Sequence, residues 1–238
     1  TYYVRAYATN VAGTSFGSEV TAITVSPAPV ALAATSITAG GFTANWNAAA
    51  GAASYRLDVS TANDFSSYVP GYQNVNVLNV TSYAVSGLSA GVTYYYRVRA
   101  VNGSGVSASS NTITVATVPP APVATAATAV TAGGFTANWN AAAGATGYRL
   151  DVSTANDFSS YVTGYQDLTV NNVTSYSVSG LAAGVTYYYR VRATNGSGTS
   201  ASSNTITVAT VPPAPVALAA TAVTAGGFTA NWNAAAGA

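Results

Sequence analysis

Apolar and polar residues alternate along most of the chain with a period of two, which is the pattern of half-buried β-strands. Residues 42–46 illustrate it, because Thr43 and Asn45 separate three apolar positions. Residues 55–59 and 94–100 repeat the alternation. Gly, Pro and Asn-Gly turn signals separate such runs, and no helical stripe competes with them. The pattern therefore predicts short antiparallel strands joined by tight turns.

The chain repeats itself with a period of 93 residues. The sequence GGFTANWNAAAGA begins at Gly40, at Gly133 (133 − 40 = 93) and at Gly226 (226 − 133 = 93). A fixed period of this kind indicates a repeat architecture. The period divides the chain into the last part of a unit, two complete units and the first part of another, at 1–26, 27–119, 120–212 and 213–238. We expect a segment of a longer array, in which the part-units are completed by the continuing chain; strand addition from other chains is the alternative.

Each complete unit carries about seven strand-like runs, each with one apolar face. Two such sheets must bury their apolar faces against each other. We therefore predict an all-β protein of tandem seven-stranded antiparallel β-sandwiches in an elongated array.

Three residues within a unit carry a family resemblance. Trp46 stands late in the second strand, and Leu88 and Tyr94 stand in the element Leu-x-x-Gly-x-x-Tyr. The same positions recur as Trp139, Leu181, Tyr187, Trp232 and Tyr2. The chain resembles tandem fibronectin type III repeats of bacterial secreted and cell-surface proteins. The resemblance implies an immunoglobulin-like sandwich without a disulfide, a tyrosine corner formed by the Leu–Tyr pair, and an extracellular or cell-surface location.

The composition excludes most catalytic chemistry. The chain has no Cys and no His, and its seven basic residues are all Arg. Zinc, haem and iron–sulfur ligation, a Ser-His-Asp triad, a phosphate-binding P-loop lysine and Schiff-base chemistry therefore lack their residues. We expect a protein that is not an enzyme and that needs no cofactor or metal. A net charge of +1 offers no electrostatic attraction to nucleic acid.

Mean hydropathy is +0.28, which raises the question of membrane insertion. The stretch between Arg99 and Arg149 has no Asp, Glu, Lys, Arg or His, but Pro119-Pro120 and Gly133-Gly134 interrupt it. A membrane-spanning helix needs about 20 mostly apolar residues in succession. We expect no membrane insertion in this segment.

Charged residues fall in register on two strands. Arg56 and Asp58 occupy the outward phase of one strand, and Arg97 and Arg99 that of another, so a cross-strand charge ladder is expected. It is either a ligand patch or a solvated ion-pair network, and we favour the network.

The segment from Asp58 to Asp64 places three side-chain oxygens over seven residues. Asx turns and capping explain it better than calcium, which needs more oxygen ligands.

Outward tyrosines are the candidate contact residues. They are Tyr68, Tyr72, Tyr95, Tyr161, Tyr165 and Tyr188. Tyrosine gives rigid contact area with a polar tip, so these side chains could bind a glycan, a cell-surface ligand or a neighbouring chain. Alternatively they cover the edge of their own sandwich, and the sequence leaves both readings open.

The pattern favours a structural function. Proline-rich segments such as 117–122 predict a semi-rigid connection between sandwiches. With 5% charged residues, the surface has little self-repulsion, so copies of the chain are the expected partners. We predict a non-enzymatic array that forms an extracellular stalk, adhesin or self-assembling filament. The alternative is a spacer or carbohydrate-binding module region of a secreted polysaccharide-active enzyme.

Overall fold

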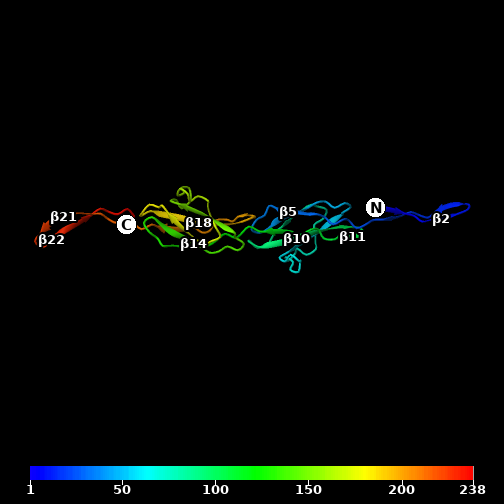
Figure 1. Ribbon diagram of the computed structural model, residues 1–238, viewed down its shortest axis with the longest axis horizontal. Helices are drawn as coiled ribbons and strands as arrows, with labels where there is room; N and C mark the ends of the chain where they lie inside the picture. The colour runs from blue at the N-terminus through cyan, green and yellow to red at the C-terminus, as the bar shows by residue number, and fades with distance from the viewer. Residues whose placement is uncertain (238) are drawn as a thin grey trace. The chain divides into compact units, whose positions relative to one another are not determined.

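The computed structural model describes residues 1–237 and contains strands but no helices in that range (Figure 1). No element there is a helix of the length and apolarity that a membrane span requires. The chain divides into two compact units. Unit 1 comprises Thr1–Ser89 and Thr93–Thr117, and unit 2 comprises Ala90–Val92 and Val118–Ala238. Each unit is described on its own below.

Unit 1 contains a β-sandwich built from two antiparallel sheets. One sheet has the order β5-β6-β9, with strands Ala31–Thr35, Phe42–Trp46 and Ser82–Val85. The other has the order β11-β10-β7-β8, with β12 also paired to β10. Its strands are Ser54–Ser60 (β7), Val75–Asn76 (β8), Thr93–Asn102 (β10), Gly105–Val106 (β11) and Ile113–Ala116 (β12).

Unit 2 repeats this arrangement. Its smaller sheet has the order β13-β14-β17, with strands Ala124–Thr128, Gly134–Trp139 and Ser175–Ser179. Its larger sheet has the order β16-β15-β18-β19, with β20 paired to β18. These strands are Gly147–Ser153 (β15), Leu168–Val170 (β16), Thr186–Asn195 (β18), Gly198–Thr199 (β19) and Ile206–Ala209 (β20). The predicted tandem antiparallel sandwiches are confirmed.

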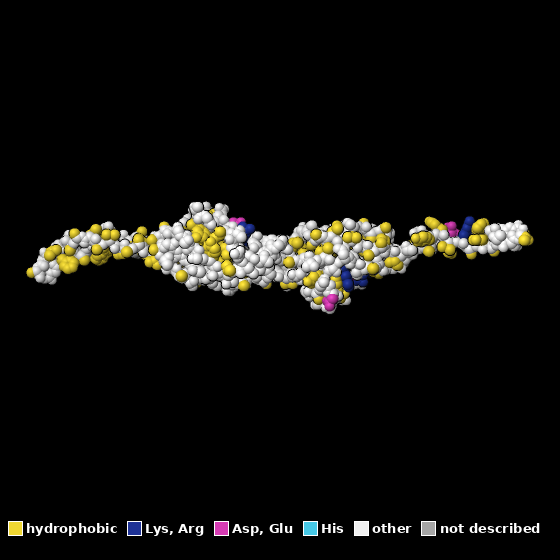
Figure 2. Space-filling model, in the orientation of Figure 1, with side chains coloured by type: hydrophobic (Ala, Val, Ile, Leu, Met, Phe, Trp, Pro, Cys, Tyr) yellow, Lys and Arg dark blue, Asp and Glu magenta, His cyan; other side chains and the backbone are white. Residues whose placement is uncertain are grey.

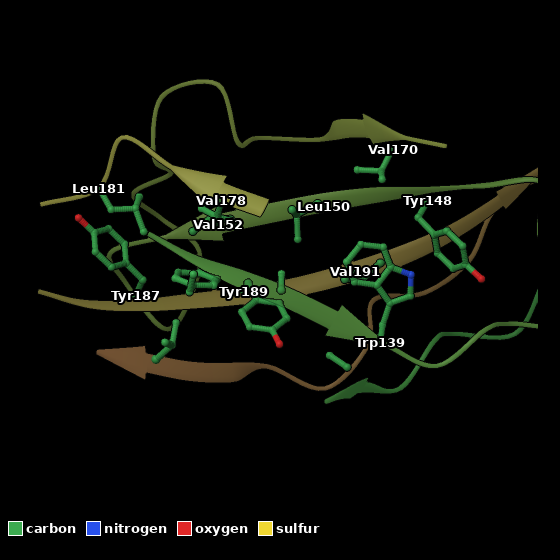
Figure 3. Close-up of a cluster of buried hydrophobic side chains, with 14 of the residues drawn as sticks. Trp139, Tyr148, Leu150, Val152, Val170, Val178, Leu181, Tyr187, Tyr189 and Val191 are labelled. Carbon is green, nitrogen blue, oxygen red and sulfur yellow. The ribbon is translucent and has the colours of Figure 1, made fainter. Parts of the chain in front are cut away.

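Alternation along the strands builds the core of each sandwich. In β10 the residues Tyr94, Tyr96 and Val98 are buried, whereas Tyr95 and the two arginines are only partly covered. Figure 3 shows the equivalent core of unit 2, in which Leu181 lies beside Tyr187 and Trp139 lies beside Tyr148. Period two thus places every second side chain between the sheets.

The residues that carry the family resemblance lie at the two ends of this core. Trp46, Leu88 and Tyr94 are buried in unit 1, and Trp139, Leu181 and Tyr187 are buried in unit 2. The hydroxyl of Tyr94 accepts a hydrogen bond from the backbone N–H of Ser89 at 2.9 Å. The hydroxyl of Tyr187 accepts the equivalent bond from Ala182, also at 2.9 Å. Each sandwich therefore has a tyrosine corner.

The part-units form hairpins outside the sandwiches. In residues 1–26, β1 (Tyr2–Val4) pairs with β4 (Val20–Ala22), and β2 (Tyr7–Asn10) pairs with β3 (Gly13–Phe16). In residues 213–237, β21 (Ala217–Thr224) pairs with β22 (Gly227–Trp232). Tyr2 is 63% exposed and Trp232 is 65% exposed. Their counterparts in the sandwiches are buried because a second sheet covers them, and these hairpins contain no such sheet.

Candidate functional site

Most charged residues of each sandwich gather on the outer face of its larger sheet. In unit 1 the pairing of β7 with β10 sets Asp58 opposite Arg97 and Arg56 opposite Arg99. Residues that face each other in an antiparallel pair point to the same side of the sheet. The predicted cross-strand charge ladder is therefore present, and β15 and β18 form the same ladder in unit 2.

The carboxylate at the centre of the ladder is buried. Asp58 is only 1% exposed and accepts hydrogen bonds from Nε of Arg97 and Nη2 of Arg99, both at 3.0 Å. The backbone N–H of Asn74 donates to its other oxygen at 2.7 Å. The expectation of a solvated ion-pair network is therefore wrong for this residue. A buried carboxylate needs this number of donors to offset its lost hydration.

The loop formed by residues 61–74 covers the carboxylate. Phe65 has a positive φ of 61° and is buried, and the guanidinium of Arg97 lies over its ring at 4.0 Å from the centroid. The Tyr68 hydroxyl accepts a hydrogen bond from Nη2 of Arg97 at 3.2 Å. The loop thus holds one arginine by a cation–π contact and a hydrogen bond. In unit 2 the residues Asp151, Phe158, Tyr161, Arg190 and Arg192 make the same contacts.

Four of the six tyrosines predicted as contact residues bond within their own sandwich. Tyr68 and Tyr161 bond to arginine as described above. The Tyr72 hydroxyl accepts from the N–H of Ser86 at 2.8 Å and donates to its carbonyl oxygen at 3.1 Å, which ties the loop to the end of β9. Tyr165 is bonded in the same way to Ser179. These four side chains therefore fasten the loop to the rest of their own sandwich.

The remaining two tyrosines are less engaged. Tyr95 on β10 and Tyr188 on β18 are half-buried and point outward. Within residues 1–237 their hydroxyl groups make no hydrogen bond. They are therefore the predicted tyrosines whose polar tips remain available to another molecule.

The acidic segment from Asp58 to Asp64 forms turns. Oδ1 of Asp64 accepts hydrogen bonds from the hydroxyl of Ser66 at 2.6 Å and from its N–H at 3.0 Å. These bonds hold the pKa of the Asp64 carboxyl below its ordinary value, and Asp157 repeats the arrangement with Ser159. Asp58 points instead toward the arginines. Over the part of the chain that the structure describes, no three acidic, Cys or His side chains are arranged to hold a metal.

Figure 2 shows charged side chains beside the projecting loop of each sandwich, on a surface that is otherwise mostly uncharged. Chemically, the site offers partly exposed guanidinium groups around a buried carboxylate whose oxygens are already engaged. Because both of its oxygens already accept hydrogen bonds, this carboxylate is not placed to exchange a proton with a substrate. The arginine side chains, in contrast, are about a quarter exposed, and a guanidinium group suits a planar anion.

Sequence reasoning missed three kinds of residue. Phe65 carries no signal of its own, since it stands in a polar segment. Tyr96 stands at a buried position of the alternation, which predicts its burial but not its hydrogen bond. The Tyr96 hydroxyl donates to the Leu32 carbonyl oxygen, and burial raises the pKa of this hydroxyl above the ordinary value of 10.0. The difference at position 74 could have been noticed by comparing the two units, because unit 2 has the acidic residue Asp167 where unit 1 has Asn74.

Comparisons with known proteins agree with this architecture. Residues 27–116 and 120–209 each match the family model described as "Fibronectin type III domain". Chitinase A1 of Niallia circulans is 32% identical over 160 residues, which are 59% of this chain and 21% of that protein. The chain thus spans about a fifth of the length of that relative.

Two solved structures are also similar. The FN1–FN3 domains of chicken CNTN1 are 19% identical with a TM-score of 0.42, over 88% of this chain and 75% of that one. A two-domain fibronectin type III segment of chicken tenascin is 21% identical with a TM-score of 0.41, over 76% of this chain and 99% of that one.

Proposed function

The chain belongs to the fibronectin type III family, and we propose that it is a non-enzymatic structural repeat array. In this proposal each sandwich is a self-contained spacer within an extracellular stalk, adhesin or self-assembling filament. The observation that carries it is the near-identity of two sandwiches, each with its own complete core. When every unit buries its own core, the number of units can change the length without changing the fold.

Each sandwich is closed by its own contacts. The side chain of Asn111 accepts a hydrogen bond from the N–H of Ala31 at 2.9 Å and donates to the carbonyl oxygen of Ala31 at 3.0 Å. This pair of bonds joins the segment just before the last strand, β12, to the start of the first strand, β5. Asn204 and Ala124 make the same two bonds in unit 2. A unit closed in this way does not depend on its neighbour for this edge, which suits a spacer.

We further propose that copies of the chain associate through the outer face of the larger sheets. Only 5% of the residues are charged. Three arginines stand on each of these faces, but aspartates neutralise part of their charge, which limits like-charge repulsion between copies. Tyr95 and Tyr188 supply amphipathic contact area on this face at a low entropic cost. Both side chains keep a hydroxyl that is free to bond to another chain.

Sedimentation velocity at increasing concentration, with electron microscopy of the same samples, tests this association. We expect larger species to form for the natural chain and to be lost in the double variant Tyr95→Lys with Tyr188→Lys. The matched control is Asn63→Lys with Asn156→Lys, which adds the same charge on exposed loop positions. Monomers at all concentrations, or equal loss of assembly in both variants, would contradict association through the tyrosines.

A second function is favoured by one comparison. The similarity to chitinase A1 supports a spacer or carbohydrate-binding region of a secreted polysaccharide-active enzyme. Co-sedimentation of the chain with chitin particles tests the binding part of this alternative. Retention that is lost in the Tyr95 and Tyr188 variant but kept in the Asn63 and Asn156 control would favour carbohydrate binding over self-association.

A further inference from the structure

The two sandwiches differ in how their arginines are neutralised. Each outer face carries three guanidinium groups, from Arg56, Arg97 and Arg99 in unit 1, and from Arg149, Arg190 and Arg192 in unit 2. Both have the buried carboxylate, but at the next acidic position unit 1 has Asn74 where unit 2 has Asp167. Arginine remains charged at all ordinary pH values, so unit 1 keeps one more uncompensated positive charge.

In unit 2 the second carboxylate sits between two arginines. Oδ1 of Asp167 lies 2.9 Å from Nη2 of Arg192, and its Oδ2 lies 3.4 Å from Nη1 of Arg149. The Asp167 side chain is 52% exposed, so this carboxylate lies at the surface above the buried one. The outer face of unit 2 is therefore itself a carboxylate site, filled by a residue of the same chain.

In unit 1 the same position lacks a carboxylate. Nη1 of Arg56 donates to the backbone carbonyl oxygen of Asn74 at 3.4 Å, and Arg56 forms no ion pair within the described residues 1–237. Nη2 of Arg99 reaches the amide oxygen of Asn74 at 3.3 Å. The side-chain amide of Asn74 also has an N–H₂ group, which donates and carries no charge.

We propose that unit 1 binds the carboxylate of a small organic acid or sugar acid between Arg56, Arg99 and the side-chain amide of Asn74. Beside the uncharged Asn74 side chain, the ligand carboxylate supplies the negative charge that Asp167 supplies in unit 2. A planar carboxylate can accept two parallel hydrogen bonds from a guanidinium group, so it binds there better than an anion without this geometry, such as chloride. Unit 2 does not bind the same ligand, because its own carboxylate occupies the arginines and repels a second negative charge.

Binding through this site is weak, since the guanidinium groups are partly exposed and each exposed ion pair contributes little. We expect a dissociation constant on the order of millimolar for a single carboxylate. The full chain is used with ¹⁵N-labelled arginine, and the Nε–Hε signals are followed by nuclear magnetic resonance. The probes are sodium D-glucuronate and sodium acetate, with D-glucose and sodium chloride as controls.

We expect saturable shifts of the Arg56 and Arg99 signals with glucuronate, and no saturable shift of Arg149 or Arg192. A response to acetate as well identifies the carboxylate alone as sufficient, whereas a response to glucuronate only identifies a sugar acid. Glucose and sodium chloride should cause neither. Linear shifts of all four arginines, equal to those in sodium chloride, would overturn the proposal.

The two units supply their own matched variants. Asn74→Asp copies unit 2 into unit 1 and should reduce the saturable response at least about tenfold, by analogy with the loss of a charge-assisted contact. The reverse variant, Asp167→Asn with Thr169→Asn, copies unit 1 into unit 2 and should give Arg149 and Arg192 the response. Thr169 is included because its hydroxyl accepts from Arg149 at 2.8 Å.

Both exchanges are compatible with the fold, because each uses a residue and a backbone conformation that the other unit already contains. Asn74 has a φ of 58° and Asp167 a φ of 52°, a left-handed region that Asn and Asp tolerate better than other side chains. Each new residue occurs naturally at the same position of the other unit. An unchanged response of unit 1 in Asn74→Asp would therefore contradict the site rather than report unfolding.

Discussion

At the residue scale, Asp58 and the arginines around it have different roles. The Asp58 carboxylate is buried and accepts from two guanidinium groups and one backbone N–H. Removing one partner of a buried ion pair costs about 3–5 kcal/mol, because the remaining charges are left uncompensated. The side chains of Arg97 and Arg99 are about a quarter exposed. The carboxylate thus positions the guanidinium groups, which remain partly accessible from solvent.

Tyr96 makes the stability of unit 1 sensitive to alkaline pH. Burial raises the pKa of its hydroxyl above 10.0, and this hydroxyl donates to the Leu32 carbonyl oxygen. Above about pH 10 the unfolded chain loses this proton while the folded chain keeps it, so stability falls as pH rises. We expect the contribution of Tyr96 to the free energy of unfolding to be fully present below pH 10 and to decrease above it. Urea unfolding at a series of pH values measures this dependence.

The matched variants are Tyr96→Phe and Tyr95→Phe. Tyr96→Phe should lower stability near neutral pH by about 1–2 kcal/mol, since a buried hydrogen bond is lost, and should weaken the alkaline dependence. Tyr95→Phe removes a partly exposed hydroxyl without a bond and should change neither. Hydrogen exchange followed by mass spectrometry resolves unit 1 from unit 2, where Tyr189 remains. An alkaline slope unaffected by Tyr96→Phe would refute this assignment.

At the element scale, the start of β6 depends on a residue without a side chain. A Cβ atom placed on Gly41 would lie 2.1 Å from the carbonyl oxygen of Val85, on the neighbouring strand β9. Backbone atoms on both strands would have to move, so we expect Gly41→Ala to destabilise unit 1 by about 1–3 kcal/mol. A Cβ atom placed on the adjacent Gly40 would have no atom within 4 Å, so Gly40→Ala is the control.

Gly134 and Gly133 repeat this contrast in unit 2, where a Cβ on Gly134 would lie 2.1 Å from the Val178 carbonyl oxygen. Thermal unfolding of the four single variants measures the effect. Gly41→Ala and Gly134→Ala should each lower the midpoint, and Gly40→Ala and Gly133→Ala should lower it far less. Equal effects of the neighbouring pair would show that chain flexibility, and not the contact with the next strand, is responsible.

The strands could be predicted from the sequence because period-two alternation is local. In β10 every second residue from Tyr94 to Ala100 is buried, as the alternation predicts, and the turn after β10 lies at the Asn-Gly signal. The loop of residues 61–74 could not be predicted, because its conformation depends on contacts distant in sequence. Phe65 packs under Arg97, and Tyr72 bonds to Ser86. Nothing in the local sequence encodes these partners.

The candidate site was predictable only in part for the same reason. Register places Asp58 and Arg97 on one outer face, so the ladder follows from alternation. Burial of Asp58 does not, because the loop that covers it is the part without periodicity. The contrast between Asn74 and Asp167 was visible in the sequence, but its meaning required the arginine positions.

At the scale of the whole molecule, the repeats act as internal controls. The positions that differ between units 1 and 2 lie mainly on surfaces and in loops, as with Pro70 and Thr163, whereas the core signature is unchanged. Identical cores keep each sandwich folded on its own contacts. Surface differences can then change binding without a cost to the fold, which is the situation proposed for Asn74 and Asp167.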